Sequence, residues 1–270
     1  MGRFWVRTVN GILTLVLAVT LGGWGAYSAY VLWDNRQVYV QAQALRKGLL
    51  EMKPAEGAAD PGPAGAPKGA AEPDFEGLLA VNPDVCGWVE MEGTAIDHPV
   101  LQGAHNLSYL NTDARGNFAL AGSIFLDSRN DKGFGDQVSL LYGHNMADHG
   151  MFADLNLYKD SAFFRAHTQG ALITPGGAYR LRILAVLVLD AADPVYFEPQ
   201  DWNGALEAFL AYTRQKALHL AREPMAGLEG ALEAEPAGEV RLLVLSTCSQ
   251  EFSGARTLVL AWMEPMESKT

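Results

Sequence analysis

The sequence predicts a mainly β domain that follows an apolar N-terminal helix, and three observations support this fold class. Short apolar or alternating runs bounded by Gly, Pro, Asn and Asp recur from Phe75 onward, as in a closed barrel or a sandwich. The chain has 270 residues, of which 49% are hydrophobic and 19% charged, enough for one core of roughly 150 to 200 residues. A long uncharged stretch precedes this region, near the N-terminus.

The N-terminal stretch has the length and composition of a membrane span. Gly11–Trp33 carries no charged residue and suffices to cross a hydrocarbon core of about 30 Å. Arg3 and Arg7 precede it, and short basic flanks stay in the cytoplasm. We therefore expect residues 1–33 to form a cytoplasmic stub and a single-pass anchor in the cell membrane. A signal peptide cleaved before Ala29 is the alternative, and both interpretations put the following domain outside the cell.

Two segments of different composition follow the anchor. Residues 34–50 have the composition of a short juxtamembrane helix, and residues 51–74 are rich in Pro, Ala and Gly, with little to bury. We interpret 34–74 as a juxtamembrane helix followed by a Pro/Ala/Gly-rich linker, and 75–270 as the folded domain.

Charge and cysteine content exclude several classes of protein. The whole chain carries a net charge of −11, and residues 75–270, with 13 basic and 25 acidic side chains, carry −12. Nucleic-acid binding is not expected, because that affinity comes from clustered Lys and Arg. Two cysteines, Cys86 and Cys248, are too few for a disulfide scaffold or a multi-cysteine zinc site. They either pair with each other or leave one working thiol.

Within the domain we expect six clear strands and two helices. The expected strands are Cys86–Met91, Ser123–Asp127, Gln137–Tyr142, Tyr179–Leu189, Val240–Thr247 and Thr257–Met263. The expected helices are Met146–Tyr158 and Asp201–Arg222. The second has an apolar face typical of core packing, made of Trp202, Leu206, Phe209, Leu210, Thr213, Ala217 and Leu220.

Cys248 and Arg256 occupy positions suited to chemistry. Cys248 ends a strongly apolar strand just where the sequence turns polar, and Arg256 opens the next apolar strand. Two strands joined by a short loop form a hairpin most simply, so these two residues should be neighbours at one rim of a sheet. A guanidinium there favours a thiolate and holds an oxygen that gains negative charge. A buried inert cysteine and a surface arginine are the alternative interpretation.

A catalytic thiol needs a histidine nearby. The six histidines are His98, His105, His144, His149, His167 and His219. We rank His144 first, because it follows an apolar strand that ends at Tyr142 and a turn at Gly143. No histidine pair has the spacing of a helical zinc motif, so no metal site is predicted.

Several motifs together resemble those of one enzyme family. V-L-S-T-C at 244–248, with Arg256 eight positions beyond the cysteine, resembles the sortase signature, although Val244 stands where Thr is common. Y-G-H-N-M at 142–146 and M-F-A-D-L at 151–155 resemble the histidine segment of class B sortases. Four further segments are similar to class B in the same order: N-P-D-V-C-G-W-V at 82–89, T-A-I-D-H-P-V-L-Q at 94–102, N-L-S-Y-L at 106–110 and G-S-I-F-L-D-S-R-N at 122–130.

The resemblance covers about residues 75–264 and implies both a fold and a reaction. The implied fold is a closed β-barrel of about eight strands with peripheral helices and a site at one rim. The implied enzyme is a cell-surface cysteine transpeptidase without a cofactor. Its partners are secreted proteins with a C-terminal signal like N-P-x-T-[GNS], and an acceptor amine of a peptidoglycan precursor or a pilin lysine.

The resemblance also implies roles for individual residues. Cys248 is the nucleophile that forms a thioester, His144 exchanges the protons, and Arg256 holds the carbonyl oxygen. Asn106 and Leu110 match positions that contact the signal peptide, while Ser246 and Thr247 are expected to line the groove beside Cys248.

Two neighbouring residues have no catalytic assignment. Asn145 either orients His144 or caps the expected helix. Cys86 is interpreted as a small apolar filler beside Trp88.

Two other functions remain open from the sequence alone. A thiol peptidase that only hydrolyses its substrate uses the same residues, and a membrane-tethered binding module needs only the fold. The presence of His144, Cys248 and Arg256 together favours an enzyme. An L,D-transpeptidase needs Gly directly before the cysteine, whereas Thr247 stands there.

Overall fold

The computed structural model describes residues 2–55, 73–234 and 240–266. The chain divides into two compact units, Met1–Gln43 and Ala44–Thr270. The Pro/Ala/Gly-rich spacer expected at 51–74 lies mostly outside the described residues.

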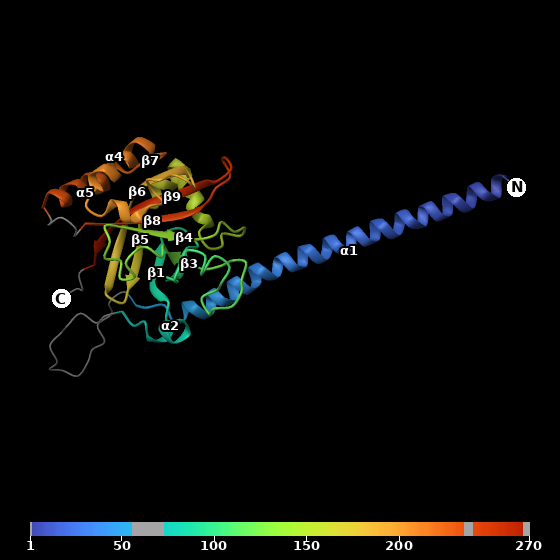
Figure 1. The fold of residues 1–270 in the computed structure, drawn as a ribbon, viewed down its shortest axis with the longest axis horizontal. Helices are drawn as coiled ribbons and strands as arrows, with labels where there is room; N and C mark the ends of the chain where they lie inside the picture. The colour runs from blue at the N-terminus through green and yellow to red at the C-terminus, as the bar shows by residue number, and fades with distance from the viewer. Residues whose placement is uncertain (1, 56–72, 235–239, 267–270) are drawn as a thin grey trace. The chain divides into compact units, whose positions relative to one another are not determined.

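The second unit is built around a closed eight-stranded barrel, as the resemblance implies (Figure 1). The strand order is β5-β1-β2-β3-β4-β8-β9-β6, and pairing of β6 with β5 closes the ring. The two-residue strand β7 extends the free side of β6. The strands are β1 (Val85–Met91), β2 (Asp97–Leu101), β3 (Ile124–Leu126), β4 (Val138–Tyr142), β5 (Gln169–Thr174), β6 (Gly177–Asp190), β7 (His219–Leu220), β8 (Arg241–Cys248) and β9 (Ala255–Pro265).

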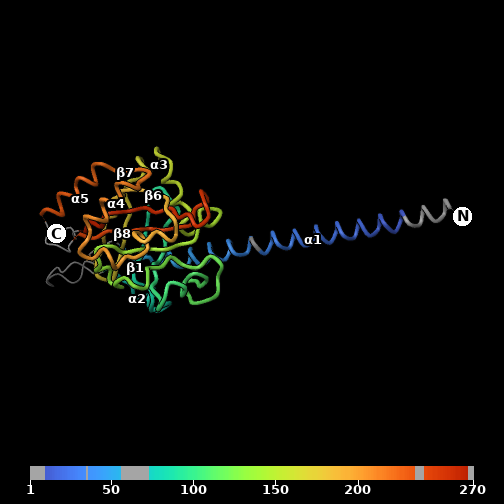
Figure 2. Tube along the Cα trace, turned by 45° about the horizontal axis from the view of Figure 1, so that its top comes forward, coloured from blue at the N-terminus to red at the C-terminus, as the bar shows by residue number. Residues whose placement is uncertain are grey.

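Most neighbouring strands run antiparallel, but two pairs run parallel. These are β2 with β3 and β4 with β8. The chain between β4 and β8 is long enough to carry most of the helices, as a parallel crossover requires. Figure 2 shows β8 in the barrel wall beneath the helices.

The helices of this unit lie outside the barrel. They are α2 (Glu76–Val81), η1 (Ala153–Lys159), α3 (Ser161–Ala166), η2 (Pro199–Trp202), α4 (Leu206–Lys216) and α5 (Arg222–Ala234). Helices α4 and α5 cover one outer side, whereas α2 lies away from them (Figure 1). Leu206, Phe209 and Leu210 of α4, with Met225 and Leu228 of α5, pack in one buried cluster with side chains of β4, β6, β8 and β9. Burying each of these large side chains stabilises the fold by about 1.5–3 kcal/mol. This side of the barrel is therefore a packed layer.

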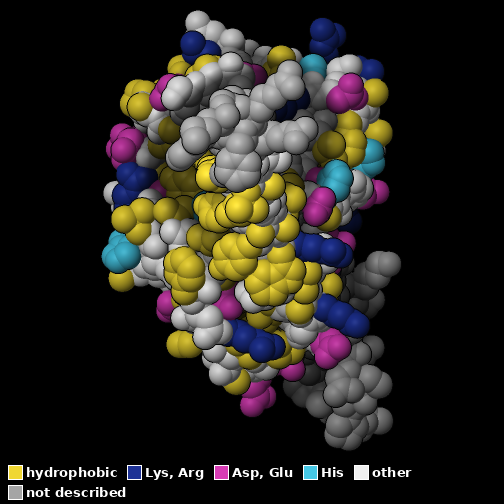
Figure 3. Space-filling model, turned by 90° about the vertical axis from the view of Figure 1, so that its right-hand side faces the viewer, with side chains coloured by type: hydrophobic (Ala, Val, Ile, Leu, Met, Phe, Trp, Pro, Cys, Tyr) yellow, Lys and Arg dark blue, Asp and Glu magenta, His cyan; other side chains and the backbone are white. Residues whose placement is uncertain are grey.

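The N-terminal helix α1 (Gly2–Leu50) is much longer than the others. Its large apolar side chains between Ile12 and Trp33 are exposed, and by length and composition it is the one described helix able to cross a membrane. Figure 3 looks along α1 from its N-terminal end, so the exposed hydrophobic side chains of this helix fill the centre of the view. The last turns belong to the second unit, where Leu49 packs with Phe75 and Leu78.

Both helix predictions inside the domain need correction. Residues 146–152 form an irregular turn instead of a helix, because Asp148, His149 and Met151 adopt positive φ angles of 57°, 60° and 53°. Only 153–159 is helical there, as the short 3-10 helix η1.

The helix expected at Asp201–Arg222 is divided into three elements. It becomes η2, α4 and β7, with Gly204 at φ 87° between the first two. Helix α5 was not predicted, but the apolar face expected on the second helix does pack in the core.

Candidate functional site

Cys248 and Arg256 lie directly opposite each other. Cys248 is the last residue of β8, Arg256 is the second residue of β9, and the antiparallel register pairs the two. Opposed residues of an antiparallel pair project from the same face, with Cβ atoms about 5 Å apart. The Cys248 side chain is exposed and that of Arg256 is half-buried. The predicted hairpin is therefore confirmed, and it brings the thiol and the guanidinium to one rim.

His144 reaches the same rim from the other side of β8. Strands β4 and β8 are parallel neighbours, and Tyr142, the last residue of β4, is in register with Ser246. His144 follows two residues later, between Gly143 and Asn145, which both hydrogen-bond to carbonyl groups of β8. The three elements β4, β8 and β9 are consecutive in the sheet, so Cys248 stands between His144 and Arg256.

Hydrogen bonds keep the two chains side by side beyond the end of β4. The Gly143 amide donates to the Ser246 carbonyl at 3.1 Å, and the Thr247 hydroxyl donates to the Gly143 carbonyl at 2.9 Å. The Asn145 side-chain amide donates to the Cys248 carbonyl at 3.0 Å. No helix begins at Asn145, so its interpretation as a helix cap is wrong. It ties the histidine segment to the nucleophile residue instead.

The imidazole of His144 has one fixed partner. Its Nε2 lies 2.7 Å from the Leu110 carbonyl oxygen. A carbonyl oxygen only accepts, so Nε2 carries the hydrogen and Nδ1 is the nitrogen left for proton exchange. The ring is half-buried, which leaves part of it accessible.

The segment after His144 stores backbone strain. Three non-glycine residues, Asp148, His149 and Met151, adopt left-handed backbone conformations here, each at a conformational free-energy cost of order 1 kcal/mol or more. Two contacts hold the turn: the Phe152 amide donates to the His144 carbonyl at 3.0 Å, and His149 Nδ1 lies 2.5 Å from Asp154 Oδ1. The hydrogen bond and the charge of Asp154 raise the pKa of His149.

A polar cluster from η1 supports the hairpin. The Asn156 side-chain carbonyl accepts from the Thr257 hydroxyl at 2.7 Å, and Thr257 directly follows Arg256. Ser249, which directly follows Cys248, donates its hydroxyl hydrogen to Glu251 and accepts from Lys159. Asn156 therefore fixes the residue next to Arg256, while Lys159 and Glu251 hold the residue next to Cys248.

Lys159 extends this cluster to the loop between β8 and β9. Its ammonium donates to Ser249 Oγ at 3.1 Å and to Glu251 Oε1 at 2.5 Å. Hydrogen bonds from Lys159 and from Ser249 lower the pKa of Glu251 to about 2. The loop that follows the nucleophile is thus held by an ion pair as well as by hydrogen bonds.

The four residues expected to bind substrate differ in burial and in hydrogen-bond partners. Ser246 and Thr247 are buried, and the Thr247 hydroxyl donates to the Gly143 carbonyl. Leu110 offers its carbonyl to His144. Asn106 donates to Asp127 Oδ2 at 2.9 Å and accepts from the Ser128 amide at 2.7 Å.

Asp127 is a fully buried carboxylate beneath these residues. Burial acts to raise its pKa, but hydrogen bonds from Arg129 and Asn106 outweigh that effect and lower the pKa. The Tyr142 hydroxyl also donates to Asp127, at 3.0 Å. Asp127 therefore joins the Asn106 segment to the end of β4, which leads to His144.

The second cysteine is separate from this site. Cys86 is buried in β1, and its thiol donates to the Val100 carbonyl at 3.5 Å. Burial raises the pKa of Cys86 to about 12, which suppresses its thiolate. Both cysteines are free thiols, and the interpretation of Cys86 as a small filler in the core agrees with this burial. Within the described residues, no three His, Cys, Asp or Glu side chains gather as metal ligands.

Sequence reasoning missed the supporting residues Asn156, Lys159 and Asp127. Asn156 lies in the segment Met146–Tyr158 that was expected to be an ordinary helix, and Lys159 lies directly after it; their partners are about 90 to 101 residues away in sequence. Asp127 follows a short apolar strand directly, and a carboxylate at a strand end was a usable signal for it.

Comparison with known proteins identifies relatives over most of the barrel. No family model matches the chain. The chain is 32% identical over 184 residues to sortase B of Listeria monocytogenes, covering 68% of this chain and 70% of that protein. It is 29% identical over 181 residues to sortase B of Staphylococcus aureus, covering 67% and 70%.

Solved structures agree with these relatives. A Streptococcus pyogenes class B sortase involved in pilus biogenesis is 34% identical, with a TM-score of 0.61 over 71% of this chain and 98% of that one. A Bacillus anthracis protein described as similar to sortase B is 26% identical, with a TM-score of 0.65 over 87% and 98%. The S. aureus sortase B–substrate complex is 28% identical, with a TM-score of 0.60 over 72% and 84%.

Proposed function

This chain is a class B sortase and thus a sortase transpeptidase, and we propose that it joins secreted proteins to a surface amine through a thioester on Cys248. One observation carries the proposal. Cys248 at the end of β8 is paired with Arg256 on β9, and His144 follows the end of the neighbouring strand β4. A thiol nucleophile, an imidazole for proton transfer and a guanidinium as oxyanion donor are groups suited to acyl transfer.

The first step cleaves the sorting signal after its threonine. The Cys248 thiolate attacks the threonine carbonyl carbon, and Arg256 holds the oxygen as it gains negative charge. The peptide bond breaks, the leaving amine takes a proton from His144, and a thioester joins threonine to Sγ. Removing one such oxyanion donor in other enzymes costs about 3 kcal/mol of barrier.

The second step transfers the threonine acyl group to an acceptor. His144 takes a proton from the incoming amine, which attacks the thioester carbonyl, and the Cys248 thiolate leaves. An amide bond replaces the thioester, so the enzyme is regenerated without an external energy source. An imidazole suits both directions of proton transfer near neutral pH.

Three solved structures of relatives suggest which substrates to test. One structure of S. aureus sortase B holds a substrate, another sortase B structure holds triglycine, and the S. pyogenes relative is involved in pilus biogenesis. The resemblance to class B sortases implies an N-P-x-T-[GNS]-like signal, and these structures are compatible with an acceptor that is either a wall-precursor amine or a pilin lysine. Asn106 and Leu110 are the proposed contacts to the signal, with Ser246 and Thr247 beside Cys248.

The cellular position follows from α1. Its exposed apolar stretch supports a single-pass anchor in the cell membrane, with the barrel on the outer side. This position brings the site to secreted proteins as they emerge. The domain boundaries at residues 33 and 74 belong to the same proposal.

Mass spectrometry of the reaction products tests the function. The full chain in detergent micelles is incubated with a peptide containing N-P-Q-T-N, alone or with triglycine or a lysine peptide. We expect cleavage after Thr and a ligated product with one of the amines. Peptide that is only hydrolysed, whichever amine is present, favours a thiol peptidase instead. No cleavage of any N-P-x-T-[GNS] peptide favours a tethered binding module.

A further inference from the structure

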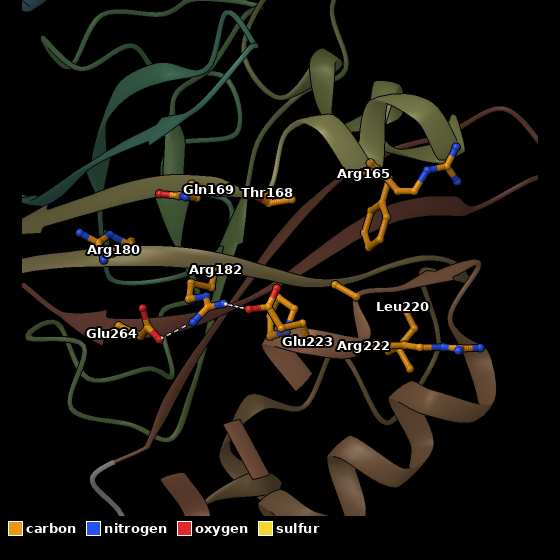
Figure 4. A pocket seen from close by; sticks show the side chains of 12 residues that line it. Arg165, Thr168, Gln169, Arg180, Arg182, Leu220, Arg222, Glu223 and Glu264 are labelled. Carbon is orange, nitrogen blue, oxygen red and sulfur yellow. Dashed lines mark hydrogen bonds and ion pairs between the residues drawn. The ribbon is translucent and has the colours of Figure 1, made fainter. Parts of the chain in front are cut away.

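An arginine-lined groove lies on the barrel away from the proposed catalytic site. It encloses about 560 Å³ and is lined by α3, β5, β6, β7, α5 and β9. Four of its lining side chains are Arg165, Arg180, Arg182 and Arg222, and two are Glu223 and Glu264 (Figure 4). The side chains lining it therefore carry a net charge of about +2, although residues 75–270 as a whole carry an excess of 12 negative charges.

The arginines of this groove differ in their ion pairing. Arg182 lies between Glu264, at 3.3 Å, and Glu223, at 3.9 Å. Figure 4 shows Arg182 with these two partners, and Arg165 and Arg222 on the far side of them from Arg180. Within the described residues, Arg165, Arg180 and Arg222 form no ion pair, so three guanidinium groups are not neutralised by a carboxylate.

The floor of the groove is apolar and held by backbone hydrogen bonds. Phe164 and Pro224 are buried and Leu220 is half-buried. The Ala221 amide donates to the Leu184 carbonyl at 2.7 Å, and the Ile183 amide donates to the Thr168 carbonyl at 2.9 Å. The floor of the groove is thus fixed, and its unpaired guanidinium groups are exposed at two ends of it, Arg180 at one end and Arg165 with Arg222 at the other (Figure 4). A ligand that contacts both ends must carry more than one anionic group.

The groove is distinct from the acyl-transfer site. Glu264 lies eight residues from Arg256 along β9, which corresponds to about 27 Å at 3.4 Å per residue. Leu258 and Leu260, which lie between them, are buried in the cluster beneath α4 and α5. A small ligand in the groove therefore does not reach Cys248.

We propose that this groove binds phosphate groups of an anionic ligand. Guanidinium forks match phosphate oxygens in bidentate geometry, and several such groups together favour a ligand with more than one phosphate. The acidic character of the remaining surface does not prevent this, since charges more than about 8 Å away are largely screened at physiological ionic strength. The same chemistry is offered by phospholipid headgroups and by soluble polyphosphates.

Calorimetry with tripolyphosphate tests the proposal. The full chain is placed in phosphatidylcholine nanodiscs and titrated at low salt. We expect saturable binding at one site, weakened at least about tenfold in Arg180→Gln/Arg222→Gln, because two unpaired charges are removed. Glu223→Gln should bind about threefold more tightly, because it releases Arg182 from one carboxylate. Arg214→Gln, a change on α4 where Arg214 pairs with Glu229, is the matched control and should bind like the wild type.

Nanodiscs that contain phosphatidylglycerol distinguish the two sources of phosphate. If lipid headgroups occupy the groove, apparent tripolyphosphate affinity falls in these discs for the wild type but not for the double variant. If only soluble ligands bind, affinity is the same in both discs. Both results support the site. It is overturned if the wild type shows no saturable binding, or if the double variant and Glu223→Gln both bind as tightly as the wild type.

Discussion

The two sides of the catalytic rim are built differently. On one side, Cys248 and Arg256 belong to the regular ladder of β8 and β9, and the whole pair from Arg241↔Met263 to Cys248↔Arg256 is in continuous register. On the other side, His144 stands in an irregular segment that follows β4 and contains three left-handed residues. The ladder is supported by many backbone hydrogen bonds, whereas the histidine segment depends on a few named contacts.

We therefore expect the two sides to differ in what a substitution changes: the stability of the fold on one side and the position of His144 on the other. Substitutions near the paired strands β8 and β9, the ladder side, should lower the free energy of unfolding when they leave a buried polar group without a partner. Changes on the histidine side should alter the reaction more than the stability, because the segment is exposed and its contacts are few. The following predictions compare the two sides, from the largest expected effect to the smallest.

Arg256→Ala tests the ladder side at the reacting atoms. We expect kcat to fall about 100- to 1,000-fold with little change in KM, since the guanidinium acts on charge that develops in the transition state. The melting temperature should change little, because the strand pairing uses backbone groups. Steady-state kinetics with a fluorogenic signal peptide measures this, with Arg214→Ala as the matched control. An equal loss in both variants would count against a role at the reacting oxygen.

A buried histidine in the barrel wall should make the stability of the fold depend on pH. His98 in β2 is buried, its Nε2 has no partner within the described residues, and burial lowers its pKa to about 4. Its folded pKa lies below the unfolded value of 6.5, so the stability it contributes is complete above pH 6.5. That stability is lost as pH falls toward 4, by about 3 kcal/mol in total.

Urea unfolding of the full chain between pH 7 and pH 4 measures this response. His98→Phe removes the titrating group, so its unfolding free energy should fall less over the same range. The catalytic rim is not involved, and activity at pH 7 should be retained. Parallel pH dependence in the two proteins would refute the assignment to His98.

Asn156→Ala tests the support beneath the ladder. Thr257 is fully buried, and its hydroxyl loses its acceptor, which costs about 1–3 kcal/mol. For a domain of this size the melting temperature should fall by about 2–12 °C. Asn117→Ala, an exposed asparagine, is the control and should melt like the wild type. If both variants melt with the wild type, Asn156 does not support the hairpin.

Asn145→Ala tests the histidine side. It removes the hydrogen bond to the Cys248 carbonyl, and we expect kcat/KM to fall about five- to tenfold, which corresponds to roughly 1 kcal/mol. Because Asn145 is exposed, the melting temperature should stay within about 1 °C. Asn145→Asp also lacks the donor and should behave alike. A fully active Asp variant would show that this contact does not position His144.

The sequence predicts the ladder side better than the histidine side. The hairpin of Cys248 and Arg256 depends on a short loop between two apolar strands, which is local information. The position of His144 depends on the parallel pairing of β4 and β8, whose paired residues are about 100 positions apart, and no local pattern encodes that register. The resemblance to class B sortases supplied this information instead.

The missed features have similar causes. The helix expected at Met146–Tyr158 is broken by positive φ angles at Asp148, His149 and Met151. Asp148 and Gly150 are turn residues, and the helix prediction gave them too little weight against the apolar residues around them. Strand β5 is short and contains Gly170, so its pattern is weak. Asn156 and Lys159 contact side chains that are about 90 to 101 residues away in sequence, so no local pattern shows these contacts.

Peptide mapping of the trapped acyl-enzyme tests the central assignment most directly. The full chain is mixed with an N-P-Q-T-N peptide without an acceptor amine, quenched in acid and digested. We predict that the mass of the acyl group ending in Thr is found on the peptide that contains Cys248. In Cys248→Ala it should be absent, while Cys86→Ala should retain it. An adduct on Cys86, or one that persists in Cys248→Ala, would contradict the account.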